Sequence, residues 1–143
     1  MEGRVIASAY FNIGLEQFIQ SVSRIDLTGD TIKVRPTRTG TYTFAATHAS
    51  MTPVVAATGG PGDVTLGTKS LKTGVDGGCF GAANAVFTAW TLGAAIDSLV
   101  VFKFVTNDAA SFPICYLDGF TVTPNGGDIT FQWAVANPFI FKI

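Results

Sequence analysis

The chain has 143 residues, close to the usual size of one domain, and we predict a single domain over residues 1–143. Charged residues make up 13% of it, about half of the roughly 25% typical of soluble domains, so either Thr, Ser, Asn and Gly cover the surface or an assembly hides part of it. The net charge of −1 argues against binding to nucleic acid or to an anionic membrane, and no apolar run approaches the ~20 residues of a membrane-spanning helix.

One helical segment is predicted near the start of the chain, around residues 10–20. Four apolar residues recur there at spacings of three and four, as on the buried face of a helix: Phe11, Leu15, Phe18 and Ile19. Beyond residue 23 the sequence changes to short runs of β-branched and aromatic residues, separated by Gly, Asn, Asp and Pro. This pattern is typical of strands joined by turns.

About eight strands are predicted, and together with the early helix they indicate an all-β fold, either a β-sandwich or a flattened barrel. We expect Pro36 to end the first strand or to place it at a sheet edge. Turns at 106–109 and 124–127 should each close a hairpin. The predicted strands are, in chain order, 31–34, 41–45, 64–72, 86–92, 96–106, 112–117, 128–134 and 139–143.

Two local features leave alternatives open. Lys33, Arg35 and Arg38 are the nearest approach to a basic patch, with Lys33 and Arg35 on one strand face, and a solvated sheet edge is favoured there over a phosphate site. The glycine-rich segment 59–62 can adopt backbone dihedrals closed to other residues, so we expect it to be mobile or to touch a partner.

Catalytic and metal-binding motifs are not found in the sequence. His48 is the single histidine, so any Ser-His-Asp or Cys-His arrangement would need it, and a lone loop histidine is typically solvated. Cys79 and Cys115 with one histidine lack the ligand spacing of a zinc site, and without a secretory signal pattern we expect two buried thiols. We therefore predict no enzyme activity, no catalytic residue, no metal and no cofactor.

The aspartates and the aromatic residues carry the remaining information. Most aspartates stand beside Gly, Thr, Asn or Ser, which predicts turns: Asp26, Asp30, Asp63, Asp76, Asp97, Asp108 and Asp128. The chain has twelve Phe, two Trp and three Tyr, more than one small sandwich is expected to bury, and the surplus predicts an interface. The aromatic residues considered for it are Trp90, Phe102, Phe104, Phe112, Phe120, Phe139 and Phe141.

Five segments, taken in order, resemble a known group of proteins. They are the helical segment 10–18, then 25–34 (IDLTGDTIKV), 42–48 (YTFAATH), 98–118 and 123–133 (TPNGGDITFQW). Their order and sequence are similar to those of small virion structural proteins of tailed bacteriophages, of the capsid-decoration or cement type. In that group a short helix commonly precedes a strand of the form I-D-L-x-x-D-T-I-K-V.

This resemblance implies a function at the capsid surface. The protein would bind and stabilise the shell of major capsid protein, would self-associate, with a homotrimer as one form, and would be made in the bacterial host cytoplasm before joining the virion. A tail or neck component of the virion is the alternative. A carbohydrate- or receptor-binding β-sandwich, with exposed Trp and Asp on the sugar, is a third reading.

Overall fold

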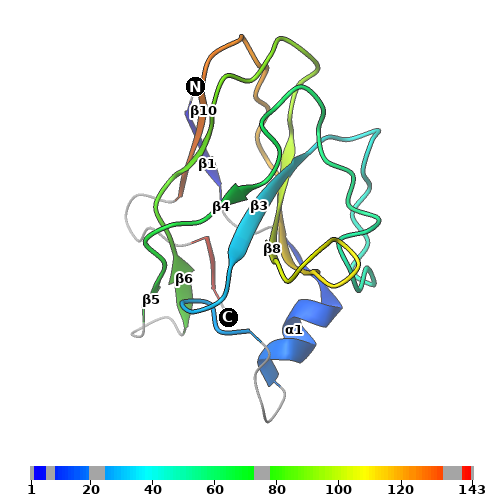
Figure 1. Cartoon of the computed structure of the whole chain (residues 1–143), viewed down its shortest axis with the longest axis vertical. Coiled ribbons are helices and arrows are strands. Elements are labelled where there is room, and N and C mark those ends of the chain that lie inside the picture. The colour runs from blue at the N-terminus through cyan, green and yellow to red at the C-terminus, as the bar shows by residue number, and fades with distance from the viewer. Residues whose placement is uncertain (1, 6–8, 20–24, 73–77, 134–139, 143) are drawn as a thin grey trace.

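The computed structural model describes residues 2–5, 9–19, 25–72, 78–133 and 140–142 (Figure 1). Within these ranges the chain is mainly β with one helix, α1 (Asn12–Ile19), which confirms the predicted fold class. The described strands are more numerous than expected: β1 (Glu2–Val5), β2 (Ala9–Tyr10), β3 (Ile32–Thr37), β4 (Val64–Thr65), β5 (Ser70–Lys72), β6 (Cys79–Gly81), β7 (Ala85–Phe87), β8 (Ser98–Lys103), β9 (Phe112–Leu117), β10 (Ile129–Trp133) and β11 (Phe141–Lys142).

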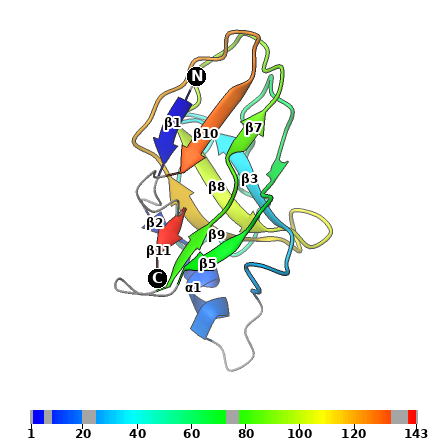
Figure 2. The same cartoon turned by 90° about the vertical axis from the view of Figure 1, so that its left-hand side faces the viewer.

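The described strands form one large sheet faced by two small ones, a sandwich-like arrangement. The large sheet has the order β2-β9-β8-β3-β4, and the small sheets have the orders β1-β10-β7 and β11-β6-β5. Figure 2 shows β1, β10 and β7 crossing in front of β8 and β3. Strands β1 and β10 pair in parallel, whereas the other ladders among the described strands are antiparallel.

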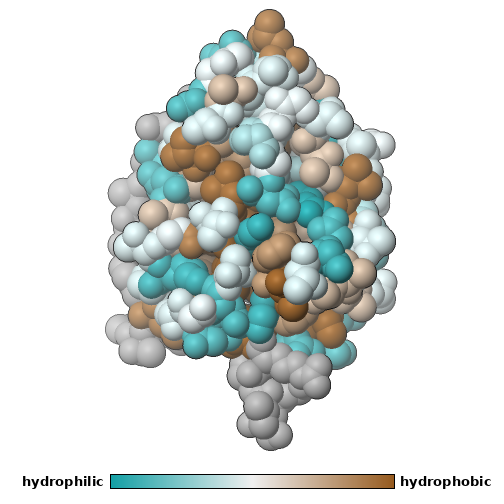
Figure 3. Space-filling model, viewed as in Figure 1, coloured by the Kyte–Doolittle hydropathy of each residue, from teal (hydrophilic) through white to brown (hydrophobic). Residues whose placement is uncertain are grey.

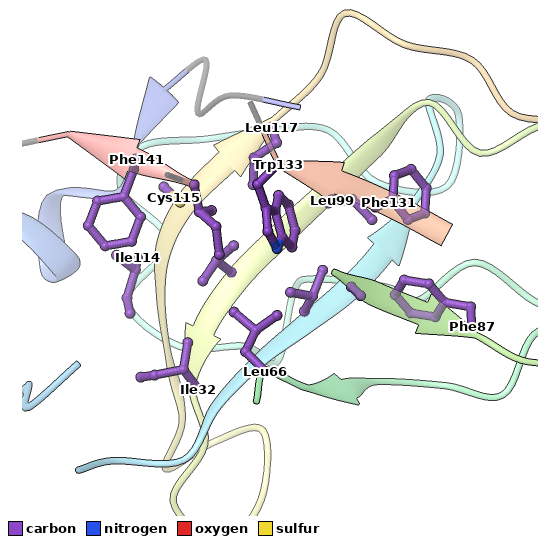
Figure 4. Packing of buried hydrophobic residues seen from close by; sticks show 14 of the residues in the cluster. Ile32, Leu66, Phe87, Leu99, Ile114, Cys115, Leu117, Phe131, Trp133 and Phe141 are labelled. Atoms are coloured by element: carbon purple, nitrogen blue, oxygen red, sulfur yellow. The ribbon is translucent and has the colours of Figure 1, made fainter. Parts of the chain in front are cut away.

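The main core lies between the large sheet and the two small ones. Along β3, Ile32 and Val34 point into it, while Lys33 and Arg35 share the opposite face, as the period of two predicts. Burial of a large apolar side chain contributes about 1.5–3 kcal/mol, so this layer carries most of the stability. Figure 4 shows residues from both layers meeting there, among them Ile32, Leu66, Phe87, Leu99, Ile114, Phe131, Trp133 and Phe141.

A long connection covers the other face of the large sheet. Residues 38–63, which we call the strap, join β3 to β4 without a helix or strand and run to the right of β3 and β8 in Figure 1. Backbone hydrogen bonds hold it, such as that from Ala57 N to Pro36 O (2.8 Å). Beneath it lies a second apolar cluster formed by Phe11, Tyr42, Met51, Val54, Val100 and Phe102.

The predicted strand 41–45 is wrong, because it falls within the strap. The N–H groups of Thr41 and Tyr42 both donate to Arg38 O, which makes a turn where a strand was expected. Its aromatic residues are buried against the outer face of the sheet instead of pairing along an edge. Tyr42 is 5% exposed, and Phe44 packs against the same cluster.

Pro36 does not end its strand, which continues to Thr37. It does lie at a local edge, since β4 pairs only with Lys33 and Val34 of β3. The carbonyl of Pro36 accepts a hydrogen bond from Ala57 N on the side that β4 does not reach, so the missing N–H of the proline interrupts no ladder.

Two other predicted strands are shorter than expected, because positive backbone angles interrupt them. Thr68 has a φ of 46°, and the predicted strand 64–72 is split there into β4 and β5. Ala89 has a φ of 48°, and β7 ends at Phe87 before it. Both angles fall in the left-handed region, which a continuing strand cannot accommodate.

Of the two predicted hairpins, one is confirmed. The turn at 106–109 lies between β8 and β9, which pair antiparallel. The turn at 124–127 does not close a hairpin, since β10 pairs with β1 and β7. Its backbone bonds to Trp90 instead, through Gly126 N to Trp90 O and Trp90 N to Gly127 O, both 3.0 Å. The C-terminal strand is confirmed for Phe141–Lys142, which pairs with β6.

The buried face of α1 differs from the predicted one. Phe11 is buried and Phe18 half-buried, but Leu15 and Ile19 are 39% and 83% exposed, while Gly14 and Gln17 are buried. The reason is a close approach between the helix and β9. A Cβ added at Gly14 would stand 2.8 Å from Ile114 Cα, so only glycine lets the two backbones pack together.

Replacing Gly14 with alanine is therefore expected to destabilise the protein by about 1–3 kcal/mol, as overpacking does. The helix propensity of alanine, better than that of glycine by about 1 kcal/mol, offsets part of this cost. Urea denaturation measures the change. Gly67→Ala is the matched control, because a Cβ there meets nothing within 4 Å. A Gly14→Ala variant as stable as the control would contradict the close packing.

Candidate functional site

The most polar cluster surrounds Arg35 on the outer face of β3, where the side chain is 8% exposed. Nε and Nη2 donate to the two carboxylate oxygens of Asp63 (2.8 and 2.7 Å), and Nη1 and Nη2 donate to those of Asp108 (2.9 and 2.8 Å). Nη1 also donates to Val54 O (2.9 Å). All five N–H donors of the guanidinium are therefore used within the chain.

These contacts correct the prediction for the basic residues. Arg35 is neither at a solvated edge nor free to bind phosphate. Lys33 Nζ lies 3.8 Å from the centroid of the Phe104 ring. Arg38 donates to Ala94 O (2.9 Å), among other acceptors. The three residues thus have separate partners and form no common anion site.

The contacts within this cluster shift the pKa values of Arg35 and Asp108. Burial alone lowers the pKa of Arg35, but the hydrogen bonds with Asp63 and Asp108 outweigh it and raise the pKa, so the guanidinium stays charged. Its hydrogen bonds hold the pKa of Asp108 below the usual value of 3.8. The ion pair between Arg35 and Asp108 therefore persists at neutral pH and down into the acidic range.

Acid is expected to weaken the fold through Asp108. A carboxylate with a lowered pKa in the folded state adds stability above its ordinary pKa, and this stability is lost as the pH falls from about 4 through the folded value. We expect the melting temperature of Asp108→Asn to lie below that of the wild type at pH 7, and we expect this gap to close as the pH falls through the lowered pKa of Asp108. Thermal unfolding monitored by circular dichroism across this range is the measurement. An unchanged gap between the two curves would count against the pairing.

His48 belongs to an aromatic cluster, which corrects the prediction of a solvated loop histidine. Its Nδ1 is 3.1 Å from the Tyr42 hydroxyl, and its ring stacks 6.4 Å from that of Phe11. Burial, and then the charge of Tyr116, raise the pKa of Tyr42 to about 12, so the hydroxyl keeps its proton and can donate it to Nδ1. The hydrogen bond joins two parts of the strap, and the stacking of His48 on Phe11 packs the strap against the residue that precedes α1.

Turn usage is confirmed for several aspartates. Asp26 accepts from the N–H groups of Thr28 and Gly29, and Asp30 accepts from Asp26 N. Asp97 and Asp128 instead accept from distant backbone N–H groups, those of Thr39 and Ala89. Asp63 and Asp108 converge on one guanidinium from distant parts of the sequence. No motif in the sequence indicates that these two aspartates meet at Arg35. Asp76 lies outside the described residues.

The prediction of more aromatic residues than the domain can bury is wrong for the described part of the chain. Trp90, Phe102 and Phe141 are fully buried, and three others are half-buried: Phe104, Phe112 and Phe120. Phe139 lies outside the described residues. The large exposed apolar side chains among those described are aliphatic: Leu15, Ile19, Val55, Leu71, Val86, Leu92 and Val105. On the face seen in Figure 3, hydrophobic residues are interspersed with hydrophilic ones.

The glycine-rich segment 59–62 packs against Trp90 and is not free. A Cβ at Gly60 would stand 2.5 Å from the indole ring, so the segment lies directly on it. Gly59, with a φ of 89°, accepts hydrogen bonds from Thr91 N (3.0 Å) and Thr91 Oγ1 (2.8 Å). The segment therefore has an internal contact on one side, while Gly59 and Pro61 are exposed on the other, and contact with a partner stays a prediction.

An apolar recess of about 410 Å³ is the candidate functional site. It lies at the end of the molecule where α1, β5 and β6 come together, in the lower part of Figure 1. Leu71, on β5, is 55% exposed there. The lining is mostly apolar: Phe18, Ile25, Asp26, Leu27, Leu71, Gly78, Cys79, Phe80 and Phe141.

The recess contains one carboxylate and one thiol. Hydrogen bonds from Gly29 N and then from Thr28 lower the pKa of Asp26, so it is ionised at neutral pH. Cys79 and Cys115 are both free and buried, which confirms the predicted thiols. Cys115 lies in the main core, where burial raises its pKa. The rest of the lining is apolar apart from Gly78, and it is this part that suits contact with an apolar group.

The described ranges contain neither a metal-ligand cluster nor a membrane-spanning helix. Within them, no three His, Cys, Asp or Glu side chains are grouped so that they could hold a metal ion. None of the helical structure in those ranges is long and apolar enough to cross a membrane. The chain matches no family model, and neither the curated proteins nor the solved structures contain a significant match.

Proposed function

We propose that this chain is a structural protein of a tailed-bacteriophage virion, and that it decorates the capsid by binding and stabilising the shell of major capsid protein. The resemblance of five ordered segments, from 10–18 to 123–133, is its sequence basis. A tail or neck component remains the alternative, since both would be assembly proteins of low charge.

The structural observation that carries the proposal is the open apolar recess. An assembly protein needs a surface that gains free energy when it is covered, and an apolar recess with an exposed leucine beside it is such a surface. By contrast, the polar groups that could have supported catalysis hold the fold together, since Arg35 donates all its hydrogen bonds to Asp63, Asp108 and Val54 O. Both tryptophans are buried, which removes the exposed indole that a sugar-binding site would need.

Particle composition tests this function. Quantitative mass spectrometry of purified virions that contain this chain is expected to give hundreds of copies per particle. A few to tens of copies would favour the neck or tail instead. Purified protein mixed with expanded capsids lacking it should co-sediment with them, and failure to bind any capsid or tail assembly would overturn the proposal.

Placing a charge beside the recess should weaken that binding. Leu71→Asp puts a carboxylate on an exposed side chain of the recess that Asp26 also lines, so we expect at least a tenfold weaker apparent affinity for capsids, with thermal stability unchanged. Co-sedimentation over a range of protein concentrations is the measurement. Leu92→Asp is the matched control, because Leu92 is 77% exposed and does not line the recess. Equal binding by both variants would show that the recess is not the contact.

A further inference from the structure

The turn at 124–127 contains Asn125-Gly126, a dipeptide that can lose ammonia without an enzyme, and both residues are exposed. In this deamidation Gly126 N attacks Asn125 Cγ. The new N–Cγ bond replaces the Cγ–Nδ2 bond, and ammonia leaves with the proton of the Gly126 N–H. Water then opens the cyclic imide at either carbonyl, which gives aspartate or isoaspartate. Because glycine has no Cβ to hinder the attack, we expect Asn125 to react fastest among the asparagines of the unfolded chain.

The fold engages the atoms that this reaction needs. Gly126 N donates its hydrogen to Trp90 O (3.0 Å), and Asn125 Oδ1 accepts from Gly127 N (3.1 Å). A second backbone bond, from Trp90 N to Gly127 O (3.0 Å), completes the pairing. The attack on Cγ requires Gly126 N to give up its proton. Amide protons held in hydrogen bonds are released to solvent only when the segment opens, so the folded turn resists the reaction.

Trp90 is a fixed partner for this hydrogen bond. Its side chain is fully buried and packs against Phe87. The residue before it, Ala89, has a φ of 48° and donates its N–H to Asp128 Oδ1 (2.8 Å). Asp128 thus attaches the backbone just before Trp90 to the residue just after the turn. How often the turn opens therefore depends on Asp128.

We propose that Asn125 is a deamidation site, and that the hydrogen bond from Gly126 N to Trp90 O suppresses the reaction in the folded protein. In the unfolded chain the site reacts freely. Isoaspartate adds a methylene to the backbone directly before Gly126 and displaces it from Trp90, and either product places a new carboxylate three positions before Asp128. A deamidated Asn125 therefore marks a chain that has been unfolded. This inference does not depend on the function proposed above.

Peptide mapping by mass spectrometry tests the proposal on the full chain, kept in mildly alkaline buffer with and without urea. The deamidated peptide differs by the mass of water minus that of ammonia. In urea, Asn125 should react several times faster than Asn12, Asn84 and Asn107, which precede larger residues. Without urea, its reaction should be slower by roughly tenfold or more, because it waits for the turn to open.

Asp128→Ala removes the acceptor of Ala89 N. It should raise the rate at Asn125 without urea about fivefold, relative to the same variant in urea, since an exposed hydrogen bond corresponds to about that factor. Asp97→Ala is the matched control, because Asp97 likewise accepts from a backbone N–H, that of Thr39, and it should leave this ratio unchanged.

Three results would overturn the proposal. The first is an Asn125 that reacts equally fast with and without urea. The second is another asparagine that reacts faster than Asn125 in urea. The third is an Asp128→Ala variant whose ratio equals that of the wild type or that of Asp97→Ala.

Discussion

Replacing Arg35 with methionine is expected to lower the free energy of unfolding by about 3–5 kcal/mol, the usual cost of removing one partner from a buried ion pair. Methionine keeps the apolar stem but leaves Asp63, Asp108 and Val54 O without their donors. The Asp63 and Asp108 side chains are 20% and 46% exposed, so water partly solvates the two carboxylates that have lost their partner. We therefore expect the lower end of the range, measured by urea denaturation at pH 7.

Arg35→Lys separates charge from geometry. Lysine keeps the positive charge but offers three donors in place of the five that a guanidinium holds in one plane, so it cannot bind two carboxylates side by side. We expect it to recover less than half of the loss. In a double-mutant cycle, Asp108→Asn should cost much less in the Arg35→Met background than in the wild type. Independent, additive costs would refute a direct coupling between the two residues.

The sequence patterns predict strands well where alternation and punctuation agree. The prediction 112–117 has the bounds of β9, because Ser111 and Asp118 flank an unbroken β-type run. The same reasoning fails at 41–45. The alternation of Tyr42 and Phe44 is the same in a strand that pairs along a sheet edge and in a loop that packs its aromatic side chains on a sheet. Thr68 and Ala89 show a different limit, because a non-glycine residue with a positive φ carries no signal in its own identity.

The polar cluster and the recess could not be predicted from the sequence. Arg35 meets Asp63 at a separation of 28 positions and Asp108 at 73, and no motif marks either distance. The recess is likewise assembled from segments that only the tertiary fold brings together. What the sequence did contain was the scarcity of charge, which indicates that each buried charge must have a partner inside the chain.

Trp90→Ala is expected to destabilise the protein by about 3–5 kcal/mol, as large-to-small substitutions of buried aromatic residues do. Trp90 is fully buried. Its ring packs against that of Phe87, with 5.6 Å between the centroids, and lies beneath Gly60. Its backbone also joins Gly126 and Gly127. Because the segment 59–62 rests on the indole, collapse around the cavity is restricted. Urea denaturation at pH 7 measures the cost, and a loss below about 1 kcal/mol would contradict this packing.

The variants Trp90→Phe and Trp133→Phe distinguish the contribution of ring packing to stability from that of the indole hydrogen bond. Trp133 Nε1 donates to Ala83 O (2.9 Å), whereas Trp90 Nε1 is buried without an acceptor among the described residues. Trp133→Phe loses a hydrogen bond worth about 1 kcal/mol as well as ring volume, but Trp90→Phe removes an unsatisfied N–H whose burial costs about 1–3 kcal/mol. We therefore expect Trp90→Phe to be the milder of the two, although Trp90 is the more deeply buried residue. The opposite order would mean that the Trp90 N–H has a partner in solution.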